Sequence, residues 1–134
     1  MKLRIKVLFL IAAIAAVSCA SKPALIPENL TAAELVQRAQ EASDRNRFAV
    51  SIQYYETILE KFPYDMEYIC TAEYEIAFIQ YKQKKYDLAK TGLNTLLERY
   101  NTQDKELLPP QYEVLAKKIL GIISETENRG KNSK

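Results

Sequence analysis

Apolar side chains recur every three or four residues along most of this chain, which is the spacing of one face of an α-helix. In the stretch from 48 to 61, for example, Ile52, Tyr55, Ile58 and Leu59 share one face. The alternating pattern of strands is almost absent. The spacing predicts five helices, at about residues 32–45, 48–61, 66–83, 86–100 and 111–125. We therefore expect an all-α fold.

Local signals support these boundaries. Thr31 and Glu34 form a capping box, in which each side chain satisfies a backbone N–H of the first helical turn. Pro63 ends the second helix, and Asp65 is a suitable N-cap for the third. Pro109 and Pro110 suit the start of the fifth helix, which is expected to turn its apolar residues toward the core: Val114, Leu115, Ile119, Ile122 and Ile123.

The first two helices align with the next two at an offset of 38 residues. The segment that starts at Arg45 matches the segment that starts at Gln83, and Ala39 corresponds to Ala77. Each unit is a helix, a short turn, an aromatic residue, a small residue three positions later, and a second helix. Small residues at such positions let two antiparallel helices approach closely.

These units resemble the tetratricopeptide repeat. Its small, aromatic and proline positions are filled first by Ala39, Phe48, Ser51, Tyr55, Ile58 and Pro63, and then by Ala77, Tyr86, Ala89, Leu93 and Leu96. The resemblance covers about residues 32–101. It implies a short α-solenoid of two helix hairpins with a C-terminal capping helix, over residues 31–126. An unrelated five-helix bundle is the alternative.

The N-terminus has the pattern of an export signal. Lys2, Arg4 and Lys6 precede an apolar run from residue 7 to 17, which is too short to span a bilayer as a helix. The small residues before Cys19 resemble the lipobox of bacterial lipoproteins. This implies a signal peptide over residues 1–18 and a lipid on Cys19, the lipid being the one covalent group expected. An ordinary secretory signal cleaved near Ala20 is the alternative.

Ala20 after the cysteine, rather than aspartate, favours the outer membrane in familiar lipoprotein sorting rules. We expect a protein of the cell envelope that faces the periplasm. Residues 19–30 contain two prolines and little periodicity, so they predict a flexible tether. Residues 127–134 are charged and contain a glycine, so they predict a disordered tail.

Composition and charge exclude several classes of function. Three of the 19 basic residues and none of the 17 acidic ones lie in the predicted signal, so the remainder is close to neutral and lacks the basic stripe that nucleic-acid binding requires. The chain contains no histidine, which removes Ser-His and Cys-His catalysis and most metal sites. We expect no catalytic residues, no metal and no dissociable cofactor. Cys70 is expected to fill the core.

The long link between the two units resembles that of particular families of tetratricopeptide-repeat proteins. Lys61-Phe62-Pro63-Tyr64, an insertion and then Ala72-Glu73-Tyr74 look like BamD, the lipoprotein family of outer-membrane β-barrel assembly, and like YbgF/CpoB-type repeat proteins. The resemblance implies a non-enzymatic protein whose partner is the barrel-assembly protein. A generic scaffold lipoprotein for cell-envelope or peptidoglycan machinery is the alternative.

Repeats of this type bind partners along the groove formed by their first helices. By this register the groove residues are Val36, Gln40, Ser43, Asp44, Tyr74, Phe78, Tyr81 and Lys82. The three aromatic residues share one helical face, and an aromatic strip with a polar rim suits an extended peptide or a partner helix. The same strip is equally compatible with a core position under the fifth helix or the tether.

Overall fold

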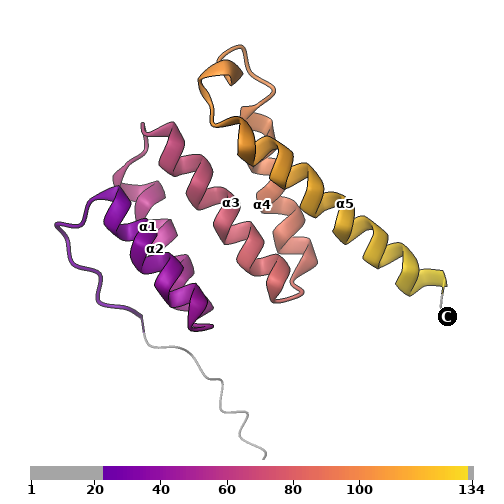
Figure 1. Ribbon diagram of the computed structural model, residues 1–134, viewed down its shortest axis with the longest axis horizontal. Helices are drawn as coiled ribbons and strands as arrows, with labels where there is room; N and C mark the ends of the chain where they lie inside the picture. Colours follow the sequence, from indigo (N-terminus) through magenta and orange to yellow (C-terminus); the bar gives the residue numbers. More distant parts are fainter. Residues whose placement is uncertain (1–22, 133–134) are drawn as a thin grey trace, which may run out of the picture.

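The computed structural model describes residues 23–132, which form an all-α fold with no β-strand among them (Figure 1). The helices are α1 (Ala32–Asp44), α2 (Phe48–Lys61), α3 (Met66–Lys82), α4 (Tyr86–Arg99), the short 3-10 helix η1 (Lys105–Leu107) and α5 (Pro110–Asn132). The predicted class is confirmed, and the first four helices begin and end within one residue of their expected limits.

The helices form two hairpins followed by α5. α1 packs on α2 and α3 packs on α4, while α2 and α3 join the two hairpins. α5 packs against α4 and α3. In Figure 1, α1, α3 and α5 lie in front of α2 and α4, so the molecule has two layers of helices. The candidate groove residues predicted from the sequence lie on α1 and α3, two of the three helices in the front layer.

The two hairpin turns have the same backbone structure. Asn46 and Lys84 are both left-handed, with φ of 57° and 59°. In the first turn the N–H of Asn46 donates to Ser43 O at 2.9 Å, and in the second that of Lys84 donates to Tyr81 O at 2.9 Å. The next N–H bonds five residues back in each case, to Ala42 and Gln80, which completes a Schellman motif. The two units, which are offset by 38 residues in the sequence, therefore share the individual backbone hydrogen bonds of their turns.

The capping signals are also present. The N–H of Glu34 donates to Thr31 Oγ1 at 3.3 Å, and Glu34 Oε2 accepts the N–H of Thr31 at 2.8 Å. These two bonds form the expected capping box. The Glu34 carboxylate gains hydrogen bonds from Thr31 in the fold, and they lower its pKa below the usual 4.5. Asp65 caps α3, as the sequence predicts.

Small residues sit where the helices of each hairpin come closest. Ala39 and Ser51 are fully buried between α1 and α2, and Ser51 Oγ donates to Ala39 O at 2.7 Å, so the one polar group there is satisfied. In the second hairpin, a Cβ added to Gly92 would stand only 3.0 Å from Ala77 Cβ. α3 and α4 are therefore in contact with no space for larger side chains at this point.

Helix α5 differs from its prediction at its end and in one apolar residue. It continues to Asn132, so residues 127–132 are helical and the expectation of a disordered tail is wrong there. Glu127 accepts from Lys90 Nζ at 2.8 Å, and Arg129 pairs with Glu125 one turn away, which supports these last turns. Val114 is expected to face the core, but it is 67% exposed, because Ala116, Ile119 and Ile123 form the buried face.

The segment 23–30 is not the free tether that its composition predicts. It is extended, but Ile26 and Leu30 pack against the core of the first hairpin. The N–H of Ala24 donates to Gln53 Oε1 at 2.8 Å, and Lys61 Nζ donates to Glu28 O at 3.0 Å. Its two prolines prevent a helix, but its apolar side chains still bury surface on α1 and α2.

Candidate functional site

Five aromatic rings form a continuous row from α5 along α3 to the start of α4. Tyr112 lies 5.5 Å from Tyr74, which stacks on Phe78 at 5.7 Å between ring centroids. Phe78 stacks on Tyr81 at 5.9 Å, and Tyr81 lies 6.2 Å from Tyr86. These separations are in the range of favourable aromatic pairs. We call these five residues the aromatic row.

The row divides into a buried and a half-exposed part, which resolves the choice between groove and core. Tyr74 is only 6% exposed and belongs to the core, because the ring of Tyr112 on α5 lies beside it. Its assignment to the groove surface is therefore wrong. Phe78 and Tyr81 pack against the same core but remain half-exposed. The Tyr112 hydroxyl shares a hydrogen bond of 2.7 Å with Thr71 Oγ1, which holds the row's α5 end in place.

Lys82 joins the row to the first hairpin. Its ammonium group lies 5.2 Å from the centre of the Phe78 ring and 5.1 Å from that of Phe48. It also donates to Ser43 Oγ at 3.0 Å. The predicted groove residues Ser43 and Lys82 are therefore brought together from different helices. This places a positive charge beside the half-exposed rings, where cation–π attraction positions it.

The other groove residues of the first hairpin have simpler surroundings. Val36 is half-buried against the core of that hairpin. Gln40 and Asp44 are exposed on α1, and no hydrogen bond within residues 23–132 joins them to the aromatic row. The structure therefore groups Phe78, Tyr81 and Lys82 with Ser43, while Gln40 and Asp44 stand beside them on the neighbouring helix.

Glu75 belongs to this region although the sequence pattern does not single it out. It is half-buried on α3, and burial raises the pKa of its carboxyl above the usual 4.5, with the Lys82 charge acting in the opposite direction. Burial raises the pKa of Tyr55 and of Tyr74, and the charge of Glu75 raises both further. Helical spacing alone does not distinguish a desolvated carboxylate from a solvated one, because the difference comes from neighbouring helices.

Glu75→Gln is expected to raise the melting temperature at pH 7. A folded-state pKa above the unfolded value means that the charged carboxylate opposes folding, so the amide removes that penalty. As the pH falls through the raised pKa and below 4.5, the wild-type carboxyl becomes neutral and the difference should vanish. Thermal denaturation of both proteins between pH 7 and pH 4 measures this. The exposed Glu56→Gln serves as a control without effect, and a gap that widened on acidification would contradict the argument.

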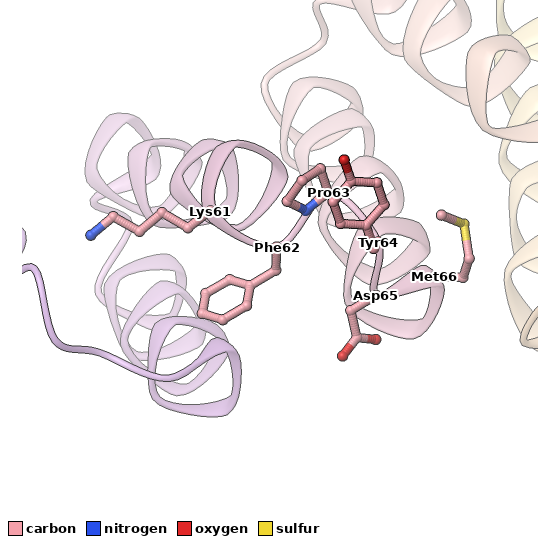
Figure 2. A pocket seen from close by; sticks show the side chains of 6 residues that line it. All are labelled: Lys61, Phe62, Pro63, Tyr64, Asp65 and Met66. Atoms are coloured by element: carbon pink, nitrogen blue, oxygen red, sulfur yellow. The ribbon is translucent and has the colours of Figure 1, made fainter.

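A surface hollow of about 520 Å³ lies elsewhere, at the link between α2 and α3 (Figure 2). Its lining is one continuous stretch: Lys61, Phe62, Pro63, Tyr64, Asp65 and Met66. Figure 2 shows Phe62 and Met66 pointing in opposite directions, and they pack on the cores of the first and second hairpins respectively. Because no other helix contributes a polar group, this hollow lacks the converging groups of a ligand site.

The described residues offer little for covalent or metal chemistry. Cys70 is fully buried, as expected, and burial raises the pKa of its thiol, which disfavours the thiolate form. Residues 23–132 contain no group of three or more metal-ligating side chains placed to share an ion. No helix within this range has the length and apolarity needed to cross a bilayer. Cys19, residues 1–18 and the end of the predicted tail lie outside the described residues.

Residues 23–132 form an all-helical fold of two matching hairpins and a fifth helix, with a half-exposed aromatic face. A comparison with known proteins finds an uncharacterized protein of Treponema pallidum (strain Nichols), 37% identical over 97 residues. The match covers 71% of this chain and 39% of the relative, so the aligned part spans about two fifths of that protein's length. No family model matches the chain. No solved structure matches it either.

Proposed function

We propose that this chain is a lipid-anchored periplasmic module that binds a partner protein through the face formed by α1, α3 and α5. The observation that carries the proposal is the half-exposed pair Phe78 and Tyr81, which lies beside the Lys82 charge. Such a surface offers apolar area, a phenol hydroxyl and a fixed cation to a partner helix or extended peptide. Binding of this kind needs no catalytic group, metal or cofactor.

The repeat supports a tetratricopeptide-like interpretation of the fold. The two turns have identical hydrogen bonds, and small residues lie at equivalent contacts, as that repeat requires. Under this interpretation α5 takes the place of the first helix of a third unit and caps the solenoid. The binding face then corresponds to the groove that such repeats use.

The most specific form of the proposal is a BamD-like accessory of outer-membrane β-barrel assembly. Its partner would be the barrel-assembly protein, held at the membrane by the lipid on Cys19. The anchor raises the effective concentration of the module near membrane partners, and the face supplies selectivity. A generic scaffold for cell-envelope or peptidoglycan machinery is the second candidate, because an aromatic pair beside a lysine suits a partner helix or peptide of either system.

A photo-crosslinking amino acid in place of Tyr81 tests the proposal in intact cells. We expect Tyr81 to yield a discrete crosslinked partner, identified by mass spectrometry. The control is the same amino acid in place of Tyr64, which is 93% exposed but lies on the link between α2 and α3. Recovery of the barrel-assembly protein supports the specific form, and recovery of peptidoglycan proteins supports the scaffold. Identical products from both positions would contradict the assignment of the face.

A further inference from the structure

The hairpin turns gather positive charge at one end of the molecule. The first turn contributes Arg45 and Arg47, and the second contributes Lys82, Lys84 and Lys85. Figure 1 shows both turns at the same end of the helix layers, and the bond from Lys82 Nζ to Ser43 Oγ at 3.0 Å joins them. We call these five residues the basic edge. Apart from Lys82, their charged groups have no ion pair or hydrogen-bonded side-chain partner within residues 23–132.

Some of the acidic groups near this edge pair with other cations. Lys90 pairs with Asp87 at 3.2 Å and with Glu127 at 2.8 Å, and Arg129 pairs with Glu125. Glu41 and Asp44 remain on α1, and they are outnumbered by the basic edge together with Arg38. Acidic residues instead predominate at the opposite end, around the link from α2 to α3 and the loop before α5, where they outnumber Lys61 and Lys105: Glu60, Asp65, Glu67, Asp104 and Glu106. The charge of the domain is therefore polarised along its helices.

The described chain begins at the basic edge. In Figure 1 the start of the described chain, drawn in indigo, lies at the same end as the two hairpin turns. Ala24 lines a surface hollow together with three arginines and one acidic residue: Arg38, Arg45, Arg47 and Glu41. The bond from the Ala24 N–H to Gln53 fixes the chain there. Three residues lie between Cys19 and Pro23, so four Cα-to-Cα steps of about 3.5 Å each span about 14 Å at most. A lipid on Cys19 would hold this end of the domain, and not the acidic end, close to the bilayer.

We propose that the basic edge docks on the headgroups of anionic phospholipids and orients the domain with its acidic end away from the membrane. Each lysine or arginine near such a surface adds attraction that acts within about 10 Å and is screened by salt. Pure tethering would leave the domain free to rotate about the anchor. This inference rests on the membrane attachment in the proposed function. The basic edge shares Lys82 with the proposed partner-binding face, but its other four residues lie on the hairpin turns.

Lysine acetylation of the full chain, reconstituted in vesicles, tests the proposal. One preparation is phosphatidylcholine alone, and the other contains one third phosphatidylglycerol. We expect Lys84 and Lys85 to react at least about threefold more slowly on the anionic vesicles, with Lys105 and Lys118 unchanged, and 0.5 M NaCl should abolish the difference. Equal rates at Lys84 on both vesicles, or equal slowing at all four lysines, would overturn the proposal. The intact mass of the same sample reports separately whether Cys19 carries a lipid.

Two matched double variants distinguish a change in the orientation of the domain on the membrane from a change in its folding. Arg47 and Lys85 occupy equivalent N-cap positions of α2 and α4 and make no side-chain cap bond, so glutamate there complements the helix dipole. Arg47→Glu/Lys85→Glu should melt no lower than wild type and lose the protection of Lys84. Lys105→Glu/Lys118→Glu makes the same charge change elsewhere and should retain that protection. Retained protection in the first variant would overturn the proposal.

Discussion

A chain that ends after Leu108 is expected to lose the cooperative unfolding transition of the intact protein, because α5 completes the core of the second hairpin. Ala116, Ile119 and Ile123 pack with Leu93 and Leu96 in one buried cluster. Removing one large core side chain costs about 2–5 kcal/mol, and a whole domain is stable by only about 5–15 kcal/mol. Circular dichroism during thermal denaturation measures the transition.

Substitutions on the buried and the exposed face of α5 are expected to differ in their effect on the free energy of unfolding. Ile123→Ala should lower the free energy of unfolding by about 2–5 kcal/mol, because Ile123 is fully buried. Val114→Ala on the same helix should change it by less than about 0.5 kcal/mol, because Val114 is mostly exposed. A truncated chain that melts like the intact one would show that α5 is not part of the core.

Ala77→Leu is expected to lower the free energy of unfolding by about 3 kcal/mol. Ala77 is fully buried where α3 meets α4, and its close approach to Gly92 leaves little space for added atoms. A leucine there must push the helices apart or take an unfavourable rotamer, and such overpacking costs about 1–3 kcal/mol or more. Urea denaturation of both proteins gives the difference from the midpoint and slope.

The control for this substitution is Ala49→Leu, which makes the same chemical change on the exposed side of α2. We expect it to alter stability by less than about 0.5 kcal/mol. If both leucine variants were as stable as the wild type, the close approach of α3 and α4 would not limit side-chain size. A loss at Ala49 equal to that at Ala77 would instead indicate an effect of leucine unrelated to packing.

Most helix boundaries follow from local rules, and the sequence predicts them well. The capping box at Thr31, the stop at Pro63 and the cap at Asp65 act through bonds within a few residues, so the structure keeps all three. The extension of α5 and the docking of residues 23–30 depend on distant contacts, through Glu127 with Lys90 and through Ala24 with Gln53. Periodicity cannot reveal such contacts, so composition predicts too much disorder for both segments.

In the candidate site too, the sequence predicts the features set by local geometry and not those set by distant contacts. Helical spacing correctly groups Tyr74, Phe78 and Tyr81 on one face, because that depends only on the geometry of α3. Which of them is covered depends on where Tyr112 of α5 lies, and the loop that positions α5 carries no periodic signal. The pairing of Lys82 with Ser43 requires the arrangement of two hairpins. The sequence therefore predicts which side chains share a helical face, but it does not predict how deeply each is buried or which side chains it contacts.

The two hairpin turns share one backbone conformation, but the left-handed position is occupied by Asn46 in the first turn and by Lys84 in the second. Asparagine adopts the left-handed conformation readily, whereas a lysine such as Lys84 does so at a cost of about 1 kcal/mol. Glycine at position 84 would relieve this strain and make the protein more heat-resistant. It would also remove a positive charge from the basic edge, so, if the proposed docking on anionic lipids holds, a search for thermostable variants would also select for weaker membrane binding.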